Sequence, residues 1–243
     1  MYFHKFDFKT KSMKTIGAFF FILVLMSSAA FAQEDDDWAS RDYPIDNFSE
    51  IYLHGGYKVF LQQGSKPALT VKTNNSDIFN NLEVNNRGDE LSLVMKEDFI
   101  TYKRIRLYIT FTKLEAIQAE GGLKLDSDGY LDLGDLRLYL EGGASVDLQL
   151  KADDVNVIGE GGVLFNLEGV ANTLTVKLSG AGHVDADEFK TEEADIAIEG
   201  VGTASVYATD RLNAQINGVG KVSYKGDPIV TQNIEGLGAV SRQ

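Results

Sequence analysis

Hydrophobic and polar residues alternate along the second half of the chain, in short runs that glycine interrupts at regular intervals. Around each interruption, apolar residues stand at even offsets from the glycine and polar residues at odd offsets, which is the alternation of a β-strand. The first glycines of the interruptions recur with a nearly constant spacing: Gly121, Gly142, Gly161, Gly180, Gly200, Gly218 and Gly236. We therefore predict seven glycine-punctuated repeats over residues 116–243.

The columns of this alignment indicate how the repeats pack. The position four residues after the first glycine is apolar in every repeat: Leu125, Val146, Phe165, Val184, Ala204, Val222 and Val240. A repeat of about 19 residues cannot bury such a face alone, but stacked copies about 4.8 Å apart can. Parallel crossovers are nearly always right-handed, so the predicted fold is all-β, a right-handed parallel β-helix or solenoid. A leucine-rich repeat and a β-propeller fit less well in signature or period.

Residues 48–115 have a different pattern, with longer strand-like runs separated by polar turns. The predicted strands are Phe48–Leu53, Tyr57–Gln62, Leu69–Lys72, Leu82–Val84, Leu91–Met95 and Ile105–Phe111. Hairpin-like turns between them favour an N-terminal mixed or antiparallel β segment. Such a segment could cover the open end of the solenoid. Since no Pro- or Ser-rich linker follows it, we predict a single domain over 48–243, comprising the segment 48–115 and the repeats.

Residues 1–32 have the pattern of a secretory signal peptide. Four lysines precede the uncharged apolar run 16–26, and small residues ending in Ala32 follow it. The run is shorter than the ~20 apolar residues of a membrane-spanning helix. The sequence thus predicts an exported protein, periplasmic, outer-surface or secreted, without a transmembrane segment. Met1 and Met13 are both suitable starts, and the acidic residues 33–47 form a predicted mobile leader.

Composition narrows the function. The chain of 243 residues has no cysteine, which excludes disulfides, Cys-ligated metals and a lipid-modified cysteine. Its formal charge is −13, and removing residues 1–32, with four Lys and one Asp, makes it −16. A nucleic-acid partner is not expected for so acidic a protein.

The repeats and their flanks resemble the exported head GIN domain family, known as a putative auto-transporter adhesin head. The resemblance covers about residues 48–228 and rests on Phe48-x-x-Ile51-x-Leu53-x-Gly55, on the Gly-x-Gly turns, and most specifically on the stretch from Asn217 to Pro228. It implies a β-helical fold, export and an adhesion or surface role, and no catalytic residues. Three early repeats depart from the family's second turn glycine, with Leu123, Ala144 and Val163.

Catalytic constellations are not apparent. The histidines after the signal peptide, His54 and His183, are most simply solvated. The sequence has no Gly-x-Ser-x-Gly elbow, and Gly218-Val219-Gly220-Lys221 is one copy of the repeat rather than a phosphate loop. We therefore predict a non-catalytic, adhesin-like binding module of the cell envelope or surface. A structural or self-assembling envelope protein is the alternative, and a glycan-processing enzyme with paired carboxylates is a weaker one.

Two columns of carboxylates are the remaining candidate chemistry. Glu120, Glu141 and Glu160 share one offset, and Asp126 and Asp147 share another. Stacking places like charges about 5 Å apart, which solvent screening or a shared cation could relieve. Carboxylate oxygens suit Ca²⁺, so a weak calcium ladder is a speculative prediction. No other cofactor is expected; the predicted partner is a protein or carbohydrate at the envelope, with a homo-oligomer as a further option.

Overall fold

The computed structural model describes residues 38–96 and 104–243. The predicted signal peptide and residues 33–37 lie outside the described residues. Residues Ala39–Gln243 form one compact unit. Its elements are β1 (Ala39–Tyr43), β2 (Glu50–Gln63), β3 (Ala68–Thr73), α2 (Ile78–Asn81), β4 (Leu82–Arg87), β5 (Glu90–Met95), β6 (Ile105–Phe111), β7 (Ala116–Ser127), β8 (Leu131–Asp132), β9 (Leu136–Lys151), β10 (Asp154–Lys225) and β11 (Ile229–Arg242).

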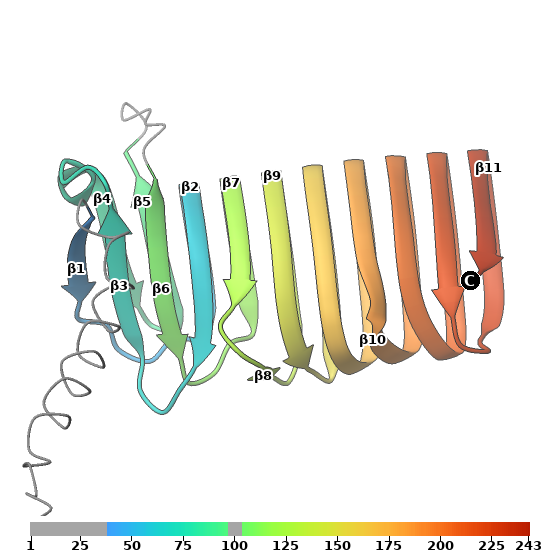
Figure 1. The fold of residues 1–243 in the computed structure, drawn as a ribbon, viewed down its shortest axis with the longest axis horizontal. Coiled ribbons are helices and arrows are strands. Elements are labelled where there is room, and N and C mark those ends of the chain that lie inside the picture. The colour runs from blue at the N-terminus through green and yellow to red at the C-terminus, as the bar shows by residue number, and fades with distance from the viewer. Residues whose placement is uncertain (1–37, 97–103) are drawn as a thin grey trace, which may run out of the picture. The chain divides into compact units, whose positions relative to one another are not determined.

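The unit is all-β apart from the short α2 within the described residues, which confirms the predicted class. Its strands form one open sheet in the order β1-β3-β6-β2-β7-β9-β10-β11 (Figure 1). From β2 to β11 along this order every pairing is parallel. We call two strand segments, or arms, that are joined by a bend glycine a coil. The long β10 runs through several coils, with successive bends at Gly161, Gly180, Gly200 and Gly218.

Equivalent glycines of neighbouring repeats lie side by side. Gly121 pairs with Gly142, Gly142 with Gly161, and Gly218 with Gly236. A Cβ built on Gly200 would lie 2.3 Å from the carbonyl oxygen of Gly180, so the same stacking continues inside β10. The predicted period therefore corresponds to coils that stack in register.

The bend needs glycine for two reasons, which Gly161 illustrates. Its φ of +113° lies in a region that side-chain-bearing residues rarely adopt. A Cβ on it would also come within 2.4 Å of the Gly142 carbonyl oxygen, so the close approach of the coils leaves no space. The bends before Leu123, Ala144 and Val163 also have glycine at positive φ, so these bulkier residues do not alter that feature.

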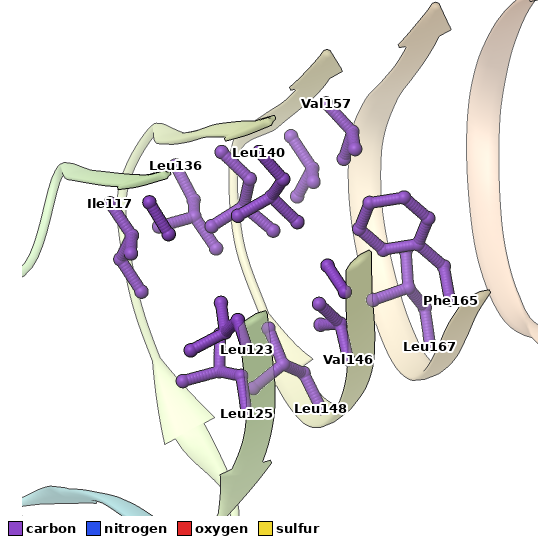
Figure 2. Packing of buried hydrophobic residues seen from close by; sticks show 14 of the residues in the cluster. Ile117, Leu123, Leu125, Leu136, Leu140, Val146, Leu148, Val157, Phe165 and Leu167 are labelled. Carbon is purple, nitrogen blue, oxygen red and sulfur yellow. The ribbon is translucent and has the colours of Figure 1, made fainter. Parts of the chain in front are cut away.

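The two arms of each coil face each other across a common apolar interior. Figure 2 shows Ile117, Leu136, Leu140 and Val157 on one side of this interior, opposite residues that follow the bends. The predicted inward residues Val146, Phe165 and Val184 are at most 2% exposed, which confirms their orientation. Burying one such side chain stabilises the fold by about 1.5–3 kcal/mol relative to exposure.

The N-terminal segment contains a repeat that the sequence analysis missed. The strands predicted at 48–53 and 57–62 are the two arms of β2, which bends at Gly55 and pairs with β7 so that Gly55 faces Gly121. Parallel β5 and β6 pair with the arms of β2, and β3, β4 and β1 add antiparallel pairs. The segment is thus mixed, as predicted, and covers this end of the stack.

One local expectation needs correction, and one short element was not predicted. Residues 39–43 belong to the predicted mobile leader but form β1, which pairs with Leu69–Thr73 of β3. Residues 78–81, for which no element was predicted, form the helix α2, whose Ile78 and Phe79 are buried. No helix among the described residues is long and apolar enough to cross a membrane.

Candidate functional site

The outer surface of the bends changes character along the stack. In the first three repeats the bend reads Gly-Gly-apolar, and the apolar residue is buried: Leu123, Ala144 and Val163. In the last four it reads Gly-apolar-Gly, and the apolar residue is exposed: Ala181, Val201, Val219 and Leu237. One exchange of positions thus moves a hydrophobic side chain from the interior to the surface, coil after coil.

The exchange follows from the packing beneath the bend. A Cβ on Gly202 would lie 3.0 Å from the Gly182 carbonyl oxygen and 3.2 Å from Cγ2 of Ile198. Since the interior there is filled by Ile198 and its neighbours, the bend can carry a side chain only on its outer side. The apolar residues that result are unusually open to solvent: Val201 is 60% exposed and Val219 48%.

Three of these apolar residues, Ala181, Val201 and Val219, form one column in the lining of a groove of about 790 Å³ that crosses four coils. A second column of lining residues comes two positions further on in each coil: Leu164, His183, Thr203 and Lys221. Leu164 is itself 56% exposed. A contiguous exposed apolar patch of this kind marks a binding surface more often than a scattered leucine or valine does. We call this feature the bend groove.

The bend groove has only three polar or charged side chains among its lining residues. His183 Nδ1 lies 2.6 Å from Thr203 Oγ1. Lys221 stands at the same position of the next coil and also lines the groove. No carboxylate lines it, although the chain as a whole is strongly acidic. The groove therefore combines an apolar surface with a single permanent positive charge.

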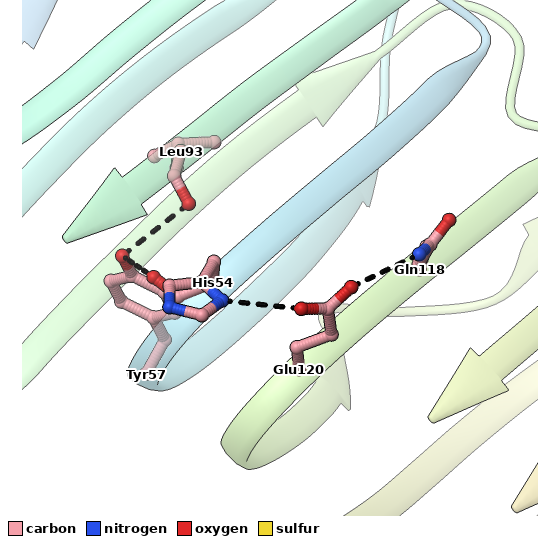
Figure 3. Close-up of polar contacts among 5 residues, drawn as sticks. All are labelled: His54, Tyr57, Leu93, Gln118 and Glu120. Carbon is pink, nitrogen blue, oxygen red and sulfur yellow. Dashed lines mark hydrogen bonds and ion pairs between the residues drawn. The ribbon is translucent and has the colours of Figure 1, made fainter. Parts of the chain in front are cut away.

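His54, the other candidate histidine, lies in the bend of β2 rather than in a catalytic arrangement. Its Nδ1 is 3.3 Å from Glu120 Oε2, and Gln118 donates to the second carboxylate oxygen (Figure 3). The buried Tyr57 hydroxyl donates to the carbonyl oxygens of His54 and Leu93, at 2.9 and 3.4 Å. Desolvation raises the pKa of Tyr57. These contacts fix the bend and explain why a tyrosine occupies the interior there.

The predicted carboxylate columns have the predicted register. Glu120 pairs with Glu141 and Glu141 with Glu160 along the stack. Their negative charge raises the pKa of the adjacent Tyr139. Glu160 is the largest cause of this shift, and Glu141 and Glu120 add to it. The sequence analysis therefore placed these side chains correctly relative to one another.

The aspartates have other partners. Lys58 Nζ lies 3.3 Å from Asp126 Oδ2, and Lys124 Nζ lies 3.9 Å from Oδ1. Asp147 accepts a hydrogen bond from Asn166 at 3.3 Å. In the part of the chain that the structure describes, no group of three His, Asp or Glu side chains is arranged to hold a metal ion. Weak calcium binding at these columns stays a prediction.

A second depression, of about 500 Å³, is polar. Four carboxylates and two cations line it: Glu115, Asp132, Asp135, Asp153, Lys113 and Arg137. Lys113 pairs with Glu115 and holds the pKa of that carboxyl below its usual value. Arg137 Nη2 lies 3.3 Å from Glu50 Oε1, and Lys151 Nζ lies 3.7 Å from Asp132 Oδ1. We call this feature the polar pocket.

Of the two depressions, sequence reasoning missed the bend groove entirely. Its signal is present in the alignment, because the residue after the first glycine changes from Gly to Ala, Val and Leu along the repeats. A turn position is ordinarily expected to be polar, so a column of exposed aliphatic residues at a turn is the informative feature.

The sequence matches one protein-family model, "Putative auto-transporter adhesin, head GIN domain", over residues 47–228. No curated protein matches the chain.

Among solved structures, a putative adhesin from Bacteroides fragilis has a TM-score of 0.80 at 24% identity, covering 86% of this chain and 98% of that one. A putative adhesin from Parabacteroides merdae has a TM-score of 0.62 at 20% identity, with 86% and 97% covered. A putative lipid binding protein from Parabacteroides distasonis has 0.61 at 18%, with 86% and 98% covered. These likenesses concern the fold.

Proposed function

Because this chain belongs to the family described as "Putative auto-transporter adhesin, head GIN domain", we propose that it is an exported, non-catalytic binding module of the cell envelope or surface. The signal-peptide pattern of residues 1–32 supports export. We further infer that the stacked coils follow the right-handed path of a parallel β-helix, since parallel crossovers nearly always have this hand. In this proposal the rigid stack serves to present a binding surface.

We infer that the binding surface is the bend groove and that its ligand is amphipathic, an acyl chain with an anionic group. One observation carries this: four consecutive coils expose aliphatic side chains beside Lys221, on a chain whose acidic groups are absent from the groove lining. Four coils at ~4.8 Å spacing span about 15–20 Å, the length of an extended acyl chain of ordinary size. The lipid-binding name of one structural neighbour agrees with this class.

A carbohydrate ligand, which the sequence analysis also allowed, is less well supported at this surface. Sugar hydroxyls need hydrogen-bond partners, and the groove offers only His183, Thr203 and Lys221. His183 and Thr203 already contact each other. An apolar ligand leaves no hydrogen bond unmade on entering such a surface, and its burial contributes about 25 cal/mol for each square ångström of apolar area.

Binding of a fluorescent long-chain fatty acid tests the proposal. We expect Val201→Asp to weaken binding at least about tenfold, because a carboxylate in the groove both interrupts the apolar surface and repels the ligand's acidic group. Val170→Asp is the matched control, since Val170 is also exposed but does not line the groove. The fatty alcohol of equal length should be insensitive to Lys221→Ala, whereas the acid should bind more weakly. Equal binding by wild type and Val201→Asp would contradict the assignment.

The polar pocket favours a second candidate function, glycan cleavage by paired carboxylates. It brings carboxylates and Arg137 together, as such an enzyme requires. A general acid, however, needs a raised pKa, and the pKa of Glu115 is shifted in the opposite direction by Lys113. Release of reducing sugar from a polysaccharide panel tests this function, and its loss in Asp132→Asn would assign it to the pocket.

The calcium prediction concerns Glu120, Glu141, Glu160, Asp126 and Asp147. If Ca²⁺ binds these columns, millimolar calcium raises the melting temperature and a chelator lowers it, because a ligand that binds only the folded state stabilises it. Glu141→Gln, which removes the central charge of the glutamate column, should then abolish the calcium effect. A melting temperature that changes with neither calcium nor chelator would contradict this prediction.

A further inference from the structure

The last strand, β11, has a long outer edge to which no strand of the described residues is paired. Its inner edge pairs with Arg211–Tyr224 of β10, and the amide of Gln243 donates to Tyr224. On its outer edge, no strand among residues 38–96 and 104–243 pairs with it (Figure 1). At the other end of the stack, β5 and β6 cover the arms of β2. The outermost strands there are β1 and β4, which come from separate segments of the chain and pair antiparallel, so the two ends differ in architecture.

This edge has few of the features that prevent an exposed strand from pairing with a strand of another molecule. Its 14 residues include no proline and no lysine, and only Glu235 and Arg242 are charged. Exposed edges of monomeric proteins are usually short, bulged or marked by inward-facing charges, because unpaired amide and carbonyl groups recruit other strands. Arg242 is held beside Asp227, at 3.2 Å, at the far end of the strand.

The apolar interior is also left incomplete at this end. Val230, Ile234 and Val240 are only partly buried, although they continue the columns of Leu212, Ile216 and Val222. Those three residues of the preceding coil are at most 1% exposed, because β11 covers them. What buries such a surface elsewhere in this protein is one more coil of the same shape and pattern.

We propose that the coil of β11 is covered by β11 of a second copy, in an antiparallel pairing about a two-fold axis through the Gly236 bend. Such a rotation lays the arm before the bend of one copy, residues 229–235, against the arm after the bend of the other copy, residues 237–242, and the reverse. Ile234 then lies opposite the partner subunit's Gly238, and Val240 opposite the partner subunit's Gln232. Even-numbered positions face even-numbered positions, so the interior of one stack continues into the other.

The two-fold pairing closes, whereas a head-to-tail pairing would extend indefinitely. Head-to-tail contact would instead pair this coil with β1 and β4, the outermost strands of the N-terminal end, which have five and six residues and come from separate segments of the chain. Charge agrees with the same choice: residues 211–243 hold four basic and two acidic side chains, in a chain of formal charge −13. The two copies thus meet at ends that lack the acidic excess.

The expected dimer is weak. A coil with arms of about seven residues at ~3.3 Å each, and a width of about 20 Å once the outward side chains of both facing sheets are included, buries on the order of 500 Å² per partner. The total of about 1,000 Å² is the lower limit of a specific interface. We expect a monomer–dimer equilibrium with a dissociation constant in the micromolar range.

Sedimentation equilibrium of the purified protein between about 1 and 200 µM tests this inference, because that range brackets a weak interface. We expect dimers in the wild type and at least a tenfold weaker association for Ile234→Lys. In the monomer the lysine reaches solvent at the open end, but in the dimer it is enclosed. Val201→Lys, the same kind of change on an exposed site away from β11, should dimerise like the wild type.

Crosslinking tests the register, since the chain has no native cysteine. In the proposed pairing the two copies of Leu237 are diagonal neighbours about 7–8 Å apart. Leu237→Cys should therefore give covalent dimers with a short bismaleimide, and Tyr130→Cys, also exposed, should not. Purely monomeric wild type at the highest concentration, a dimer that persists in Ile234→Lys, or open-ended oligomers would each overturn the proposal. Loss of fatty-acid binding would not affect it, because the groove variants lie on other residues.

Discussion

Replacing Gly161 by alanine is expected to destabilise the fold by about 3 kcal/mol or more, although the change adds a single methyl group. The new Cβ would lie 2.4 Å from the carbonyl oxygen of Gly142, on a backbone at φ +113°. The neighbouring coil cannot retreat without breaking its own pairing with the coil beyond. Urea unfolding followed by circular dichroism measures the effect as a lower midpoint at unchanged slope.

The adjacent Gly162 provides the matched control. It has no positive φ in the left-handed region and no atom within 4 Å of a built Cβ. Gly162→Ala should therefore change the free energy of unfolding by about 0.5 kcal/mol or less, as surface substitutions do. Similar losses in the two variants would mean that general backbone entropy, rather than the close stacking of the bends, explains the glycines.

Phe165→Ala is expected to cost about 3–5 kcal/mol, the usual range for a buried aromatic side chain. Phe165 is 2% exposed and lies in the interior between the arms (Figure 2). Neighbouring coils are held by their own strand pairings, so they cannot close the cavity that the missing ring leaves. The loss should appear as a lower urea midpoint and a lower melting temperature.

Leu164→Ala, one residue earlier, should affect ligand binding rather than stability. Leu164 is 56% exposed and lines the bend groove, so its truncation should change stability by about 0.5 kcal/mol or less and yet weaken fatty-acid binding. The two neighbouring variants thus separate the interior of the stack from its binding face. Equal stability losses would show that the strand does not alternate at this point.

The repeating part of the fold could be predicted from the sequence because its physical cause is local. Inward positions such as Val146 and Val184 recur with the bend glycines, and each recurrence falls within one coil of the chain. The coil of β2 was missed because its bend at Gly55 lies several coil lengths away in sequence from its partner Gly121. Strands β3 to β6 occupy that interval, and an alignment with a constant period cannot bridge it.

The candidate site was predictable only in part, for a related reason. The glutamate column at Glu120 and Glu141 is a consequence of the repeat register and was placed correctly. The cation nearest to Asp126 is Lys58, which belongs to the unrecognised coil, so this ion pair could not be predicted from the repeats. The bend groove was not predicted because its signal is a column of aliphatic residues, whereas the predicted site residues are all charged.

The in-register bends have a consequence for how this protein can diversify. The intervals between successive bend glycines are unequal, yet the glycines remain aligned from Gly121 to Gly161, so length changes are absorbed away from the bends. Each of the four coils at the groove contributes two outward positions to its lining, such as Val201 and Thr203. A single substitution therefore alters one step of the surface while the scaffold is kept, and new specificities can evolve coil by coil.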